Sequence, residues 1–360
     1  LEADNRTDGP GAEFRIWLLT EPVAPAETQA STGDGRPGTL CFADNSFLSS
    51  LRFQSAQFTG VSNWTPASLA VTNKWLIFPD GFALGVTNDI AIGAGGILEI
   101  SNANVTVGGN LNMTNGGLFY IYAAPTNAPA PNYGTLISLA RDMDVATNST
   151  LFVNSHPTNG GSALFRMRTL TVAAGGKFDA DGKGFRSSLG PGRGAAGAGA
   201  GYGGAGSSAV WPAFNPGGIT YGSSNAPIDP GSGGGLIANP VWGGGLVRIE
   251  AARDVVLNGT ISANGQSDTV DRSGGGSGGG IYIRCGRQFN GGGALSANGG
   301  VTPLYSGGGG GGGRIAVWSV YPLFTGTATA SGGAGFDGNG QPGTVIIGRL
   351  VPPGTIFVVH

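Results

Sequence analysis

The chain has 360 residues and a formal net charge of −2, and 71 of its residues are glycine. Charged residues make up 11% and hydrophobic residues 40%, which argues against the highly charged, weakly hydrophobic composition of disordered chains. No basic stretch predicts nucleic-acid binding, and no apolar run reaches the roughly 18 residues of a membrane-spanning helix.

The first segment, residues 1–60, combines a strand-like run with a proline-rich, polar stretch. The alternating apolar residues Phe14, Ile16 and Leu18 predict a strand that can add to the sheet of a neighbouring subunit. We therefore interpret this segment as strand-containing and as a possible contact between subunits.

Residues 61–185 are a regular series of short apolar runs separated by Gly, Asn or Ser, without a sustained helical period. Hairpin sheets usually have longer strands and stronger turn pairs, so runs this short favour a β-solenoid whose rungs stack on one another. The predicted fold is all-β, an elongated parallel β-helix or β-solenoid. Its predicted strands in this region are 90–92, 98–100, 105–107, 111–113, 118–121, 136–139, 151–153, 164–167 and 170–172.

The glycine-rich insertion, residues 186–245, has the low complexity that is typical of a flexible linker. Glycine loses more backbone entropy on ordering than any other residue, so an ordered insertion needs dense backbone hydrogen bonding. The alternative to a linker is therefore a set of polyglycine segments in polyproline-II-like conformation that lie side by side and bond laterally.

Residues 246–360 contain glycine-rich β repeats, which are the strongest signal in the sequence. Each unit is predicted to hold a glycine stretch, a hydrophobic strand, a second short strand and a turn of small residues. Equivalent positions are Ser262, Ser296 and Thr329, and a diverged copy before the insertion places Asp179 at the same position. A unit of this size cannot bury a core alone, so we expect the copies to stack into one body.

Residues 160–350 repeat a pattern of a glycine run, a strand and a turn, and the turn reads Ser-Ala-Asn-Gly at 262–265 and 296–299. In this pattern the chain resembles the glycine-rich, β-helical repeat regions of secreted bacterial surface and adhesin-like proteins. Residues 66–185 look like a right-handed β-helix of the kind found in adhesins and polysaccharide lyases. The resemblance implies an extracellular or cell-surface location and an adhesive or structural role, and it brings no catalytic residue with it.

Few residues are candidates for chemistry, because the chain has two histidines and so little basis for a catalytic triad or a metal cluster. Asp179 and Asp181, in Asp-Ala-Asp-Gly, look like the start of a calcium loop. The equivalent repeat positions hold Ser, Asn and Thr, which favours a backbone-bonding turn. We predict no catalytic residue and no cofactor, and Asp179 and Asp181 are kept as calcium candidates.

Modification sites are predicted from cysteines and from sequons. Cys41 and Cys285 could form one long-range disulfide or remain two buried thiols, and the sequence does not decide between these alternatives. Asn-X-Ser/Thr sequons, which acquire sugar in a glycosylating secretory pathway, begin at Asn5, Asn63, Asn104, Asn112, Asn148 and Asn258.

The two ends of the predicted solenoid suggest its function. Solenoid ends carry unpaired backbone groups, which natural proteins cap or stack against another subunit. Near the C-terminus Ile356 and Val358 predict a second assembly strand. The favoured hypothesis is an extracellular structural protein, a self-assembling filament or surface-layer subunit whose partners are copies of itself. The alternatives are a glycan-binding adhesin segment with exposed aromatic residues, and a polysaccharide lyase-like enzyme.

Overall fold

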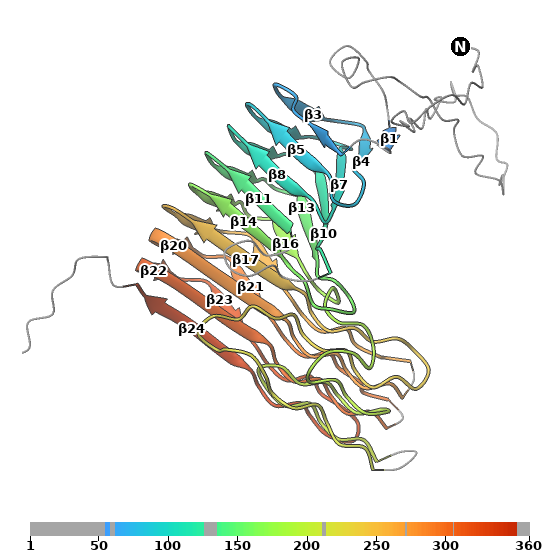
Figure 1. Ribbon diagram of the computed structural model, residues 1–360. Helices are drawn as coiled ribbons and strands as arrows, with labels where there is room; N and C mark the ends of the chain where they lie inside the picture. The colour runs from blue at the N-terminus through green and yellow to red at the C-terminus, as the bar shows by residue number, and fades with distance from the viewer. Residues whose placement is uncertain are drawn as a thin grey trace, which may run out of the picture.

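The computed structural model describes residues 55–57, 62–125, 135–210, 214–270, 272–304 and 306–350. Across these residues the regular structure consists of strands, with no helix. The chain coils through three strands per turn, and each turn, which we call a rung, stacks on the previous one (Figure 1). The named strands of the described chain pair in parallel, so the predicted all-β, parallel solenoid-like fold is confirmed at this level.

Face one of the solenoid contains the first strand of each rung. Its members are β2 (Asn63–Trp64), β5 (Ala83–Val86), β8 (Asn104–Val107), β11 (Thr135–Leu139), β14 (Ala163–Met167), β17 (Leu246–Ala251), β20 (Gly280–Gly291), β22 (Arg314–Phe324) and β24 (Thr344–Arg349). β20 and β22 are long enough to turn the corner and continue onto face two, where Phe289 pairs with Val255. Faces one and two are thereby joined into one 15-stranded sheet of the described residues.

Face two contains the second strand of each rung. Its separate strands are β3 (Leu69–Val71), β6 (Ile90–Ile92), β9 (Leu111–Met113), β12 (Met143–Val145), β15 (Leu170–Val172) and β18 (Val255–Leu257).

Face three forms a second sheet, with nine strands in the part of the chain that the structure describes. They are β1 (Ser55–Gln57), β4 (Trp75–Ile77), β7 (Ile97–Ser101), β10 (Leu118–Tyr122), β13 (Thr150–Asn154), β16 (Lys177–Asp179), β19 (Thr260–Ser262), β21 (Ala294–Ser296) and β23 (Thr327–Thr329).

The core consists of columns of apolar side chains that point inward, one per rung. Alternation along each strand places every second residue inside, as in β8, where Val105 and Val107 are buried and Asn104 and Thr106 are exposed. One column on face one passes through Leu84, Val105, Ile137, Phe165, Ile249, Ile283, Val317 and Ile347. Its members from Leu84 to Val317 are at most 1% exposed, so the solenoid has a continuous apolar interior.

The strands predicted over 90–172 all form, and the repeat stacks in the predicted register. Ser262 pairs with Ser296, Ser296 pairs with Thr329, and Asp179 of the diverged copy pairs with Ser262. The predicted unit of two strands was incomplete, because each rung has three. In the first of these units the missing strand is β18. In the next two units it is the far half of β20 and of β22, and no turn in the sequence separates it from the first half of the same strand.

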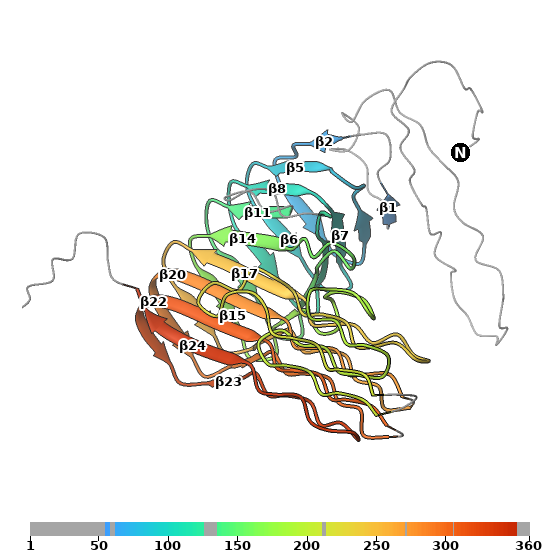
Figure 2. The ribbon, with the colours of Figure 1, turned by 60° about the horizontal axis from the view of Figure 1, so that its bottom comes forward.

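The glycine-rich segments leave the solenoid at the corner between face three and the following face one. Before β16 this corner ranges from two residues, 102–103 between β7 and β8, to 12 residues, 123–134 between β10 and β11. After β16 it lengthens to 180–245, and later rungs carry the excursions 263–279, 297–313 and 330–343. Figure 2 shows these segments running side by side beyond the ends of the strands as a layered bundle, which we call the glycine bundle.

Backbone hydrogen bonds hold the glycine bundle together with a period of three residues. Each of the later excursions runs out and back as an antiparallel pair, and its returning segment also bonds at least two other segments. For 307–313 the bonds, donor before acceptor, are Gly308–Gly197 and Gly311–Ala200, Gly309–Gly338 and Gly312–Gln341, and Gly310–Gly300 and Gly313–Ala297. Three residues per turn is the period of a polyproline II helix, the conformation expected for these segments from the sequence.

Glycine is required inside the bundle because the neighbouring backbones occupy the space of a side chain. A Cβ atom added to Gly310 would lie 2.1 Å from the carbonyl oxygen of Gly276, and one added to Gly278 would lie 2.1 Å from that of Ala297. These distances are far below van der Waals contact, so close approach, more than turn geometry, explains the glycine content.

The insertion is fastened to face one through a buried arginine. The Arg314 guanidinium lies 5.4 Å from the ring centroid of Tyr202, and its Nε donates a 2.9 Å hydrogen bond to the carbonyl oxygen of Tyr221. The two tyrosine rings pack together with centroids 4.7 Å apart, and Tyr202 is fully buried. Cation–π and hydrogen-bond contacts therefore couple the glycine bundle to the solenoid.

Candidate functional site

The last rung leaves part of the solenoid interior uncovered. Within the described residues β24 pairs with β22 on one side and with no strand on the other. Its inward side chains Val345 and Ile347 are 42% and 38% exposed, whereas their partners on β22, Ile315 and Val317, are fully buried. Apolar side chains that a further rung would cover are thus in contact with solvent.

Faces two and three end one rung earlier, with the far half of β22 and with β23. Pro322 and Phe324 continue face two beyond Phe289 and Gly291, and Ala328 pairs with the buried Leu295 on face three. The rings of Phe289 and Phe324 lie 4.7 Å apart, and Phe324 and Ala328 are only partly buried. We call the terminal members of these columns the end surface: Pro322, Phe324, Ala328, Val345 and Ile347.

The first rung differs from the last, although it also has strand edges. β2 and β3 each pair on one side only within the described chain. The inward residues Leu69 and Val71 of β3 are nevertheless buried, at 5% and 0% exposure. Beside them the rings of Trp64, Phe78 and Phe82 pack in sequence, with centroid distances of 6.2 and 4.8 Å. The two ends therefore offer similar backbone edges but unequal apolar exposure.

The assembly residues predicted from the sequence, Phe14, Ile16, Leu18, Ile356 and Val358, lie outside the described residues and stay predictions. The end surface uses other residues, which the sequence interpretation missed. The available signal was the alternation of Val345 and Ile347 in the last strand of the repeat.

Cys285 is a fully buried free thiol that points inward from β20. It lies between Ala251 and Ser319 of the adjacent rungs. Burial raises the pKa of this thiol to about 11, so it is protonated and a poor nucleophile at neutral pH. Its predicted disulfide partner Cys41 lies outside the described residues.

The calcium candidates belong to a ladder of turn side chains at the base of the glycine bundle. Asp179 Oδ1 lies 2.6 Å from Lys183 Nζ. Asp181 Oδ1 accepts a hydrogen bond from the backbone N–H of Asn264, at 2.6 Å. On the following rungs the bond recurs from Asn298 N–H to Asn264 Oδ1 and from Ser331 N–H to Asn298 Oδ1, both at 2.8 Å. The geometry is that of a backbone-bonding turn repeated on four rungs.

Five of the six predicted glycosylation sequons lie on described residues, and Asn5 lies outside them. The side chains of Asn63, Asn104, Asn148 and Asn258 are exposed, and Asn112 is half-buried on β9. Exposure makes these four accessible for modification, which itself stays a prediction.

Comparison with protein families, with curated proteins and with solved structures finds no match for the chain. Among the described residues no helix could cross a membrane, and no group of three or more His, Cys, Asp or Glu side chains is placed to hold a metal ion.

Proposed function

We propose that this chain is an extracellular structural protein that assembles end to end, with the end surface of one copy packed against the first rung of the next. The observation that supports the proposal is the exposure of Val345 and Ile347 at the end of an otherwise buried apolar core. Contiguous exposed apolar residues are characteristic of interaction sites.

The strand edges favour a head-to-tail contact. β24 has an unpaired outer edge, and so do β2 and β3 at the other end, within the described residues. Pairing the last rung of one copy with the first rung of another would continue the parallel sheets and cover the end surface. The two contacting surfaces are different, and continuing the sheets keeps successive copies on one axis, so the contact stays open and produces a filament.

The test is sedimentation velocity of the full chain over a wide range of concentrations, followed by negative-stain electron microscopy. We expect concentration-dependent growth and filaments with a constant axial repeat. The double variant Val345→Lys/Ile347→Lys should remain monomeric, because two ammonium groups at the contact would have to lose their water.

The matched control is Val270→Lys, since Val270 is 74% exposed in a loop of the glycine bundle, away from the end surface. It should assemble like the parent chain. A parent chain that stays monomeric, or that stops at a discrete dimer, would overturn the head-to-tail proposal. So would a double variant that still forms filaments.

A further inference from the structure

The strand edges at the two ends of the solenoid are staggered in opposite senses. Along the chain the faces follow one another in the order one, two, three, and the described strands begin with β1 on face three and finish with β24 on face one (Figure 1). At the first end face three therefore reaches one strand beyond faces one and two. At the last end face one reaches one strand beyond faces two and three. The end of one copy and the start of another thus have the profiles of a single coil that continues.

The number of strands on each face shows how closely the two profiles fit. Within the described residues, faces one and three hold nine strands each. Face two holds eight, namely six separate strands and the far halves of β20 and β22. A coil continued from one copy to the next would therefore have nine rungs per copy and would lack one strand at each junction, on face two.

The columns of face one keep their register from its first strand to its last. Trp64 of β2 and Ile347 of β24 belong to one inward column, which passes through the seven strands between them without a slip. Asn63 and Ile346 belong in the same way to the neighbouring outward column. Trp64 is partly buried, and Ile347 is 38% exposed. The inward column is therefore open to solvent at both ends.

We propose that successive copies continue one solenoid in this register, with β1 of each copy paired to β23 of the preceding copy and β2 paired to β24. This contact rests on the end-to-end assembly proposed above and specifies the partner of each edge strand. Parallel pairing would satisfy the outer edges of these strands, and Trp64 would continue the inward column beyond Ile347. A contact rotated about the axis would pair strands of different faces, and the inward columns would end at the junction.

The vacant position on face two lies where the chain leaves β24. The N–H of Leu350 donates a 2.8 Å hydrogen bond to the carbonyl oxygen of Ser319, as the N–H of Ala252 donates to that of Met167 where an earlier rung enters face two. Three residues are enough for a face-two strand such as β15. In the proposed contact, residues 351–353, which lie outside the described residues, occupy the vacant position. Each copy thus supplies the strand that the junction lacks.

The axial repeat of the filament tests this register on the parent chain. Rungs of a β-solenoid lie about 4.8 Å apart, so nine rungs correspond to about 43 Å. Electron cryomicroscopy of filaments measures the repeat directly. A repeat of about 48 Å would require ten rungs per copy, and so an additional rung between the two ends, which would overturn the proposed pairing.

Cysteine cross-linking tests the pairing of β2 with β24. Paired residues of neighbouring strands have Cα atoms about 4.8 Å apart, within the range that a disulfide spans. In a Cys41→Ser background, the chain with Asn63→Cys/Ile346→Cys should form covalent polymers on mild oxidation, seen by non-reducing electrophoresis. Each single variant alone should form none, because a head-to-tail junction holds one of each position, and an equimolar mixture of the two should give covalent dimers.

The control pair is Asn63→Cys/Asp144→Cys, since Asp144 is exposed in the middle of face two and should not cross-link. A parent chain that forms no filaments would overturn the assembly together with its register. Filaments that have another repeat, or that persist in Asn63→Cys/Ile346→Cys without cross-linking, would overturn the register alone. Covalent dimers of the Asn63→Cys chain by itself would indicate a head-to-head contact and overturn both.

Truncation tests the occupant of the vacant position on face two. Deletion of residues 351–360 should raise the critical concentration for filament formation roughly tenfold, because the apolar columns of face two would be left open to water at each junction. Filaments that form at an unchanged critical concentration would overturn the assignment of residues 351–353 to face two.

Discussion

The early rungs are packed with side-chain atoms, whereas the glycine bundle is packed with backbone atoms. In the rungs from β2 to β16, inward Leu, Ile, Val, Met and Phe side chains fill the space between the three faces, and the corner after face three holds at most 12 residues. In the glycine bundle, the corner extends into long excursions whose backbones are themselves the packing units. One region is stabilised mainly by burial of side chains and the other by backbone hydrogen bonds.

This difference determines which substitutions each region tolerates. A side-chain core responds to lost volume, because a deleted side chain leaves a cavity. A backbone-packed bundle responds to added volume, because the first atom of any side chain meets a carbonyl oxygen, as at Gly310 and Gly278. Substitutions that remove a core side chain and substitutions that add one to the glycine bundle therefore test the two regions separately.

The largest expected effect is on the side-chain core. Phe165 is fully buried in the middle of its column and packs edge-to-face on Phe178, with ring centroids 5.5 Å apart. Phe165→Ala should lower the free energy of unfolding by about 4 kcal/mol through lost burial and a cavity. Urea denaturation followed by circular dichroism measures the change.

The control for this substitution is Thr106→Ala on β8, whose side chain points outward and is exposed. It should change the free energy of unfolding by less than about 0.5 kcal/mol. Similar losses in the two variants would mean that the inward columns do not carry the stability of the early rungs.

The second prediction tests the glycine bundle. Gly310→Ala places a Cβ where the carbonyl oxygen of Gly276 lies, and relief requires separation of two bonded segments. We expect a loss of about 3 kcal/mol, the upper part of the range for overpacking. Hydrogen exchange should show lost protection in 273–279 and 307–313, with the early rungs unaffected.

Gly292→Ala is the matched control, because a Cβ there would have its nearest neighbour at 4.0 Å, the Thr325 hydroxyl, and the position is exposed. This variant should be as stable as the parent chain or slightly more so. Equal destabilisation by both substitutions would attribute the glycine requirement to something other than close backbone approach.

Much of the solenoid could be predicted from the sequence because its local signals agree with its tertiary structure. Short alternating runs gave the strands over 90–172, and the Ser262, Ser296 and Thr329 repeat gave the register of the later rungs. Both signals depend on residues close in sequence or on a near-constant period. The polyglycine conformation was also accessible, since ordered glycine needs backbone partners.

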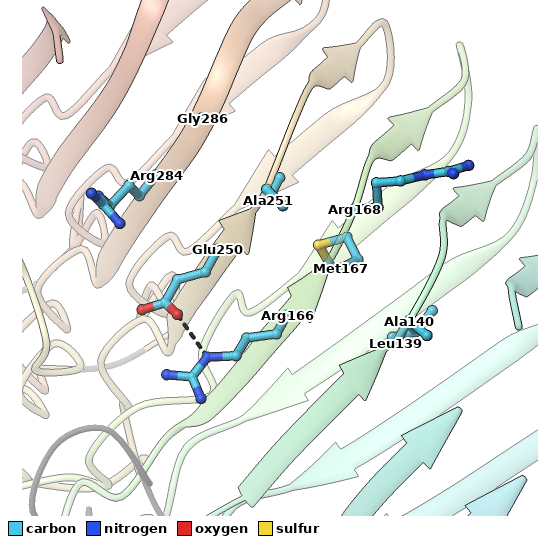
Figure 3. A pocket seen from close by; sticks show the side chains of 10 residues that line it. Leu139, Ala140, Arg166, Met167, Arg168, Glu250, Ala251, Arg284 and Gly286 are labelled. Atoms are coloured by element: carbon cyan, nitrogen blue, oxygen red, sulfur yellow. Dashed lines mark hydrogen bonds and ion pairs between the residues drawn. The ribbon is translucent and has the colours of Figure 1, made fainter. Parts of the chain in front are cut away.

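The contacts between charged residues of adjacent rungs could not be predicted because their register depends on irregular corners. Arg168 and Arg253 are adjacent in space, yet the whole 180–245 excursion lies between them. Arg166 and Glu250 are separated in the same way and still form an ion pair (Figure 3). No sequence period connects such pairs, so they come together only when the rungs are stacked.

The smallest expected effect lies where the two regions meet, at the ladder of turn side chains. Asn298 Oδ1 accepts the backbone N–H of Ser331, and its own N–H donates to Asn264 Oδ1. Asn298→Ala should cost about 1 kcal/mol, because the Ser331 N–H loses its acceptor while the backbone donor of residue 298 is kept. Asn298→Asp should retain stability at neutral pH, since Asp181 already fills the equivalent place with a carboxylate. Thermal unfolding of both variants measures these changes. If Asn298→Asp destabilises as much as Asn298→Ala does, the side-chain amide nitrogen of Asn298, and not its accepting oxygen, stabilises the turn.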